Sequence, residues 1–178
     1  MVKKKTTKEL LGESLEELLK CKPFEKITIS EISENCGIGR RTFYNNFKDK
    51  YDLAAWLYLR QLEDYVDIND RIGLAEFIRY SAEVVEKDIQ LIIAIDQYKG
   101  QNNLRDSLVK PMTEIFIKVI ERSCECKVNT EIRQDIEFFV GGQITFVGRA
   151  IDTAAAPSVD EVTDLFIRCI PESIKQFF

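Results

Sequence analysis

The chain has 178 residues, of which 45% are apolar and 31% charged, a composition typical of a folded protein of one or two modules and not of a disordered chain. It contains no histidine, which excludes Ser–His–Asp hydrolysis, histidine-ligated zinc and every mechanism that uses imidazole as a proton carrier. Its five cysteines include no C-x-x-C pair, and no apolar stretch reaches the ~20 residues that a membrane helix needs. We therefore expect a cytoplasmic protein without a membrane segment, a metal site or a cofactor.

Basic residues are concentrated at the amino-terminal end. Residues 1–50 hold 11 Lys or Arg and eight Asp or Glu, whereas the rest of the chain holds 14 basic and 22 acidic residues. A basic module on an acidic body indicates an anionic partner for the first part of the chain only.

The first fifty residues predict three short helices. A leucine stripe over residues 10–19 has helical spacing and gives the first. Thr28 and Glu31 are spaced as a capping box, which begins the second helix, and Gly37 stands where a left-handed residue can end it. The third helix is expected over residues 40–45.

Helix, glycine turn and helix within residues 28–47 form the pattern of a helix-turn-helix. Phe43 and Phe47, four residues apart, would hold the second of these helices against the core. The side chains on its other face are polar, and the major groove of DNA admits one α-helix whose side chains read base edges or hold phosphates. We expect DNA contacts from this face, the alternative being an α-hairpin with incidental arginines. The outward residues are Arg40, Arg41, Thr42, Tyr44 and Asn45.

Residues 28–50 closely resemble the signature of the TetR family of bacterial transcriptional regulators. The run Thr-Phe-Tyr-x-x-Phe-Lys-x-Lys, from Thr42 to Lys50, is its most diagnostic part, and the resemblance covers residues 7–65. It implies an all-α fold. A three-helix helix-turn-helix domain over residues 5–65 would precede a C-terminal effector-binding and dimerisation domain over residues 66–178.

The resemblance also implies how each residue meets DNA. Side chains at the positions of Arg40, Arg41, Thr42 and Asn45 face the groove, and those at Thr28, Tyr44, Lys48 and Lys50 hold backbone phosphates. Two residues of this DNA-binding set depart from the family pattern, since members often have Ser in place of Gly39 and Gly in place of Arg41. The second departure adds a long cation on the groove side, so the base preference of other members does not transfer to this chain.

The rest of the chain predicts more helices and no catalytic signature. Asp49 is expected to cap a helix to Asp67 that joins the two regions. Pro111 and Pro171 lie inside helical patterns, so each should kink or restart its helix. The body helices are expected over Leu74–Lys87, Ile89–Tyr98, Leu104–Cys124, Glu131–Thr153 and Ser158–Phe177.

The segment Phe138–Gly148 is apolar on every side and holds three glycines. A helix of this kind must be covered all round, so one side should face the core and another a second subunit. It resembles a segment of the TetR subgroup that includes the activator of a dihydroxyacetone kinase operon, in which the last two helices of two subunits form a four-helix dimer. The alternative is one large intramolecular core. The expected dimer contacts are Phe139, Gly142, Phe146, Val162, Phe166 and Ile170.

TetR-type regulators usually take a small effector between the body helices. We expect such a site where apolar walls meet a few polar groups, although aromatic residues at helical spacing also serve as plain core. A protein co-regulator could replace the small molecule. A cavity would favour a small-molecule effector, and an exposed apolar patch would favour a protein partner. The candidate lining residues are Tyr58, Tyr80, Tyr98, Phe138 and Gln143.

Together these features predict a sequence-specific DNA-binding transcriptional regulator and not an enzyme. We expect a repressor that acts as a homodimer on a palindromic, double-stranded DNA operator and is released or switched by an effector. Two alternatives remain at this point. One is an activator controlled by a protein co-regulator. The other is a helical adaptor that does not bind DNA, against which the pair Arg40 and Arg41 argues.

Overall fold

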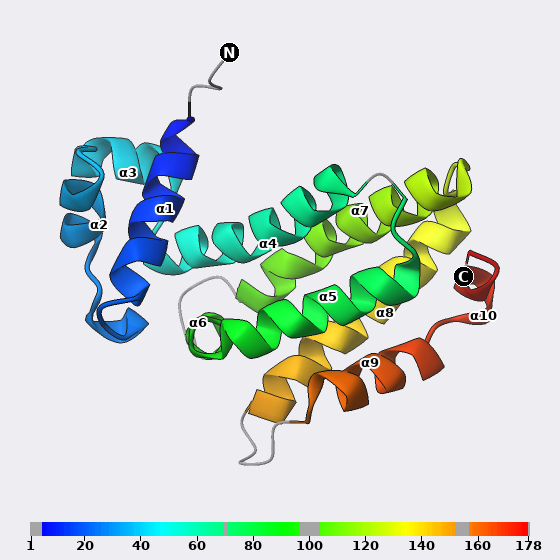
Figure 1. The fold of residues 1–178 in the computed structure, drawn as a ribbon. Helices are drawn as coiled ribbons and strands as arrows, with labels where there is room; N and C mark the ends of the chain where they lie inside the picture. The colour runs from blue at the N-terminus through cyan, green and yellow to red at the C-terminus, as the bar shows by residue number, and fades with distance from the viewer. Residues whose placement is uncertain (1–4, 70, 97–103, 152–156, 178) are drawn as a thin grey trace.

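The structure is a computed structural model, and it describes residues 5–69, 71–96, 104–151 and 157–177. Over these ranges the chain forms the α-helices α1 to α10 and one short 3₁₀ segment, η1, with no strand (Figure 1). None of the helices in these ranges is long and apolar enough to span a membrane. All five cysteines are free thiols. The all-α fold class predicted from the sequence is confirmed.

The first helices form a small bundle at one end of the molecule (Figure 1). α1 covers Thr7–Leu19, η1 Phe24–Lys26, α2 Ile29–Asn35 and α3 Arg40–Asn46. Apolar side chains from each helix meet in a core that excludes water, which is the main source of stability for so small a unit. Its most deeply buried members are Leu11, Leu15, Phe24, Ile32 and Phe43, each exposed by 1% or less.

Local hydrogen bonds define where these helices begin and end. In the predicted capping box of α2, Glu31 N donates to Thr28 Oγ1 over 3.2 Å, and Thr28 N donates to Glu31 Oε2 over 2.9 Å. Gly37 ends the helix with φ of +67°, a conformation that costs glycine little. A second capping box, between Thr6 and Glu9, begins α1 and was not predicted.

α4, Lys50–Ile68, connects the amino-terminal bundle to the body of the protein. It packs against α1 at one end and against α7, Leu104–Cys124, along most of its length. Asp49 caps it as expected, since its Oδ1 accepts from Tyr51 N and Asp52 N at 2.9 Å. The predicted boundary at residue 65 therefore falls within a continuous helix.

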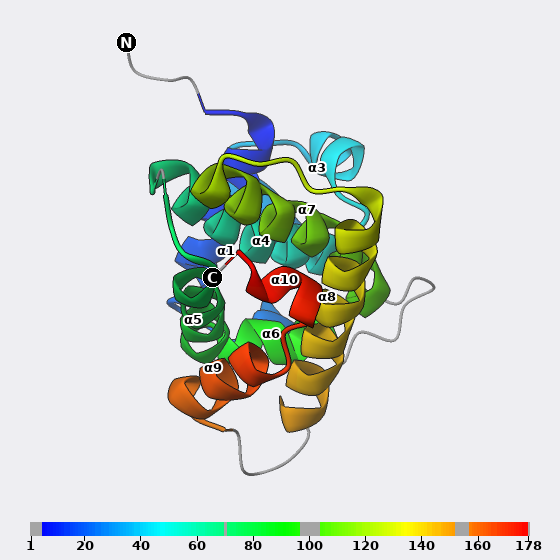
Figure 2. The same ribbon diagram turned by 90° about the vertical axis from the view of Figure 1, so that its right-hand side faces the viewer.

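The body contains two helix pairs. α7 packs against α8, Thr130–Ile151, and α5, Leu74–Lys87, packs against α9, Val159–Arg168 (Figure 2). α6, Ile89–Asp96, contacts α4, α7 and also η1 of the amino-terminal bundle.

Proline affects the body helices in two different ways. The predicted helix over residues 158–177 is interrupted, because α9 stops at Arg168 and Pro171 takes the N-cap position of α10, Glu172–Lys175. Pro111 does not interrupt α7, which continues through it.

Candidate nucleic-acid interface and cavity

α3 is held to the bundle by one aromatic face. Phe43 is fully buried and Phe47 is 3% exposed, and their ring centroids lie 6.0 Å apart. This contact fixes the rotation of the helix, so the polar residues predicted to face DNA are all exposed at the surface of the bundle. They are Arg40, Arg41, Thr42, Tyr44 and Asn45, with Tyr44 half exposed at 50%.

Three cations of this surface are available to an anionic ligand. Arg40, Arg41 and Lys48 are exposed, and none of them forms an ion pair within the described part of the chain. Gly39, at the N-cap of α3, is exposed and provides no side-chain cap. An uncompensated basic helix that projects from the bundle can approach a phosphate backbone without first losing an internal partner.

Thr28 is exposed but already has partners inside the chain. Its hydroxyl donates to Glu31 Oε2 over 2.9 Å, and Lys22 forms an ion pair with the same carboxylate. These bonds hold the pKa of Glu31 at about 2, with the hydrogen bond from Lys22 as the largest cause. The side chain of Thr28 therefore caps α2 in this structure.

The structure gives Lys50 a role different from the predicted phosphate contact. Its ammonium donates to the carbonyl oxygens of Phe24, Glu25 and Ile27 over 2.9, 3.0 and 2.9 Å. It also lies 4.6 Å from the ring centroid of Phe24, and burial lowers its pKa. An ammonium has three N–H donors, so all of them are used. Lys50 thus fastens the start of α4 to η1 in the structure without DNA.

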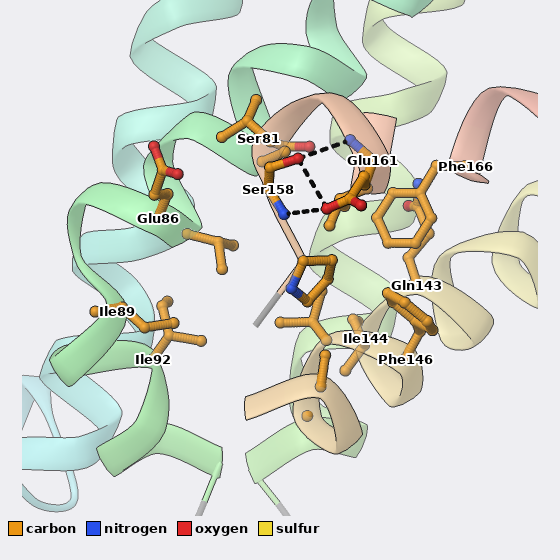
Figure 3. A pocket seen from close by; sticks show the side chains of 18 of the residues that line it. Ser81, Glu86, Ile89, Ile92, Gln143, Ile144, Phe146, Ser158, Glu161 and Phe166 are labelled. Atoms are coloured by element: carbon orange, nitrogen blue, oxygen red, sulfur yellow. Dashed lines mark hydrogen bonds between the residues drawn. The ribbon is translucent and has the colours of Figure 1, made fainter. Parts of the chain in front are cut away.

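The body contains a cavity of about 620 Å³, partly open to solvent, that reaches from α4 to α9. α5 and α6 form one wall with Val85, Ile89 and Ile92, and α8 forms the opposite wall with Ile144 and Phe146 (Figure 3). The size and the apolar lining are those of a small-molecule site.

The cavity contains two of the five predicted lining residues, Tyr58 and Gln143. Tyr80 lies outside it and stacks on Tyr65 with 3.6 Å between ring centroids. Phe138 is 84% exposed and points away from the protomer, so its predicted place in the lining is wrong. Tyr98 lies outside the described residues.

Few polar groups enter the cavity. The Tyr58 phenol is deeply buried, which raises its pKa and keeps it protonated. Gln143 is 8% exposed, and its Nε2 has no hydrogen-bond partner. Glu161 accepts hydrogen bonds from the backbone and hydroxyl of Ser158, which lower the pKa of its carboxyl and keep it ionised.

The comparisons with known proteins agree with this geometry. The family profile described as "Bacterial regulatory proteins, tetR family" matches residues 13–56, which contain α2, α3 and the surface just described. The DNA-binding part of the chain is thus of the TetR type. It is 25% identical over 146 residues to the HTH-type dhaKLM operon transcriptional activator DhaS of Lactococcus lactis subsp. lactis (strain IL1403), covering 72% of this chain and 76% of that protein.

Two solved structures share the TetR fold over nearly the whole chain. The dihydroxyacetone kinase operon activator DhaS superimposes with a TM-score of 0.63 at 16% identity, over 96% of this chain and 97% of the other. The TetR family repressor AlkX from Dietzia sp. strain DQ12-45-1b gives a TM-score of 0.67 at 18% identity, over 96% of each chain. The fold is thus that of a TetR-family DNA-binding transcriptional regulator.

Three of the six predicted dimer residues are buried inside the protomer. Phe139 and Phe166 are each 6% exposed and Ile170 is 4% exposed. Phe146 and Val162 are partly buried and line the cavity. Gly142 is exposed, and a Cβ there would meet nothing within 4 Å.

Sequence reasoning missed the α5 and α6 wall of the cavity and the internal partners of Lys50. Val85, Ile89 and Ile92 have the same apolar character as the core residues beside them, so no local signal distinguishes a cavity wall from a filled core. The three carbonyls that hold Lys50 come from residues more than twenty positions away, and only the fold brings them together.

Proposed function

We propose that this TetR-family regulator binds a palindromic operator as a homodimer and is switched by a small molecule in the 620 Å³ cavity. The cavity is the observation that carries the effector part, since an apolar space of this size beside a DNA-binding domain suits a ligand better than a protein partner. Its described titratable lining groups are Glu86, Glu161 and Tyr58, and the hydroxyl that donates to Glu161, that of Ser158, belongs to the capping box of α9. We propose that the cavity binds its ligand without converting it.

The route from cavity to DNA passes through α6. Ile89 and Ile92 of α6 line the cavity, and the same helix contacts η1, whose carbonyls hold Lys50 at the start of α4. A ligand that moves α6 therefore acts on the segment that orients the amino-terminal bundle. It changes DNA affinity only if it binds one of the two arrangements more tightly than the other.

The outer face of α8 supports the homodimer. Phe138 is 84% exposed and lies one turn from the exposed, open position of Gly142. A large apolar side chain beside a residue without a side chain suits the close approach of a second helix. Two helix-turn-helix units related by a twofold axis then read the two halves of a palindrome.

We propose repression as the sign of regulation. Repression requires only that the dimer occupy its operator, whereas activation requires in addition a surface that contacts the polymerase. A reporter gene placed behind the selected operator should be silent with the regulator present and active without it. Higher expression in the presence of the regulator would make it an activator.

The proposed function can be tested with the purified protein. Binding sites are selected from random DNA duplexes, and affinity for the selected site is then measured by fluorescence anisotropy with and without small-molecule fractions of a cell extract. We expect a palindrome, bound as a dimer, and a fraction that changes its affinity. Selection of a single half-site would contradict the dimer, and affinity unchanged by every fraction would contradict the effector.

A further inference from the structure

Gln143 brings to the cavity an amide nitrogen that has no partner among the residues that the structure describes. Gln143 is 8% exposed and lies between apolar neighbours of α8, and its Nε2 makes no hydrogen bond. Figure 3 shows its side chain beside Phe146 and Phe166 at the cavity. A buried donor without an acceptor costs stability, so this amide is satisfied only when a ligand or a trapped water supplies an oxygen.

The charges around the cavity exclude an anionic ligand head. Among the described lining residues there is no Lys or Arg, whereas Glu86 and Glu161 contribute two carboxylates. The carboxylate of Glu161 stays ionised through its bonds to Ser158. A carboxylate or phosphate on the ligand would lose its hydration here and find no cation to replace it.

A second donor lies on a different wall. The Tyr58 phenol of α4 is 8% exposed and makes no hydrogen bond with any residue that the structure describes. Both buried polar groups can therefore donate to an acceptor on the ligand. Most of the other residues that line the cavity have aliphatic or aromatic side chains.

Resting on the proposed effector role of the cavity, we infer that its ligand is an uncharged, mainly apolar molecule with an oxygen acceptor that binds Gln143 Nε2. Ketones, esters and long-chain alcohols belong to this class. Gln143 is then the residue that selects for the polar end of the ligand, and Glu86 and Glu161 select against anions.

Displacement of a neutral dye from the cavity tests this inference. Nile red is bound to the full-length protein and displaced by decan-1-ol or by decanoate, which have the same chain length and differ in the charge of the head. We expect decan-1-ol to bind at least about tenfold more tightly than decanoate, because the carboxylate must be desolvated without a partner. Glu86→Gln should improve decanoate binding about twofold, as expected for a partly exposed charge.

Two variants on the same helix isolate the amide. Gln143→Leu should weaken the binding of decan-1-ol about three- to tenfold, the usual value of one hydrogen bond. Gln134→Leu, at an exposed position of α8 outside the cavity, should behave as the parent protein. If Gln143→Leu does not fold, as judged by circular dichroism, Gln143→Met provides the same comparison with a more flexible side chain.

The possible results separate the ligand class from the proposed function. Decanoate binding as tightly as decan-1-ol would overturn the ligand class while leaving the cavity as an effector site. An unchanged affinity for decan-1-ol in Gln143→Leu would overturn the role of Gln143. Failure of Nile red and of both ligands to bind saturably would contradict the effector role of the cavity itself.

Discussion

At the scale of single residues, α3 and the start of α4 hold cations in two different situations. Arg40, Arg41 and Lys48 are exposed without an ion pair in the described ranges, whereas the ammonium of Lys50 is enclosed by three carbonyls. Sequence motifs cannot make this distinction, because both kinds of residue are basic and lie close together in the chain. The two situations predict different mutant behaviour.

Arg41→Ala and Lys48→Ala should separate base contacts from phosphate contacts. A guanidinium on the outer face of α3 can bond a guanine edge with two N–H groups, so Arg41→Ala should cost about 1–3 kcal/mol on the selected operator and relax preference at one base pair. Lys48→Ala should weaken binding to all DNA sequences equally. It should also lower the slope of log affinity against log salt concentration by about one per lost phosphate contact, hence about two per dimer. Binding is measured against operator and random DNA at several salt concentrations.

Lys175→Ala is the control for the loss of a positive charge, since α10 lies at the opposite end of the molecule from α3 (Figure 1). It should leave both the affinity and the salt slope unchanged. An identical, sequence-independent loss in Arg41→Ala and Lys48→Ala would show that Arg41 binds phosphate.

Lys50→Met should reduce stability before it affects DNA contacts. The variant keeps the length of the side chain and removes three hydrogen bonds to the η1 segment, leaving its carbonyls without donors. We expect a loss of about 1–3 kcal/mol in the free energy of unfolding, measured by urea denaturation. At a temperature where the variant is folded, its salt slope should equal that of the parent; a lower slope would restore the predicted phosphate contact of Lys50.

At the scale of elements, the sequence predicts helix ends well and helix rotation less well. Thr28, Glu31 and Gly37 act through their immediate neighbours, so the spacing alone identified the capping box and the left-handed turn. In α8 the segment Phe138–Gly148 has two polar residues, and one of them, Gln143, is buried, so polarity alone does not indicate which side faces outward. Phe139 therefore packs on Phe116, 6.0 Å between centroids, while Phe138 beside it is 84% exposed.

The capping boxes of α1 and α2 make stability depend on pH in the acid range. The bonds from Thr6 and from Arg60 lower the pKa of Glu9 to about 2, and those from Lys22 and Thr28 lower the pKa of Glu31 to about 2. A carboxyl with a lowered folded pKa stabilises the protein above its unfolded value and loses that contribution as the pH falls. The free energy of unfolding should therefore decrease between pH 4.5 and about 2.

Glu9→Gln and Glu31→Gln should each flatten this pH dependence, measured by urea denaturation at several pH values. Glu34→Gln is the matched control, because Glu34 is exposed on α2 and its carboxylate accepts no hydrogen bond from the residues that the structure describes. A pH profile that is the same in all three variants would show that the capping carboxylates do not determine the acid stability.

At the scale of the whole molecule, the outer face of α8 is the proposed contact between two subunits, on which the reading of a palindrome would depend. Phe139, Phe166 and Ile170 are buried in the protomer, whereas Phe138 and Gly142 are exposed and form the contact that we propose for a second subunit. Phe138→Arg places a charge in the proposed contact, and Gly142→Leu fills the space that a partner helix would occupy. Phe138 is exposed and the space beside Gly142 is open, so neither substitution removes a core contact. The free energy of unfolding of the protomer should therefore change by no more than about 0.5 kcal/mol.

Both variants should sediment as monomers at micromolar concentration, where the parent protein sediments as a dimer. They should lose affinity for the full palindrome and keep the affinity of one bundle for a half-site, because α3 and its contacts are unchanged. Ile68→Arg provides the control, since Ile68 is 81% exposed at the end of α4 and lies on a different helix. If Phe138→Arg and Gly142→Leu remain dimeric while Ile68→Arg becomes a monomer, the subunits meet through the end of α4 and the two DNA-reading helices are spaced by that contact.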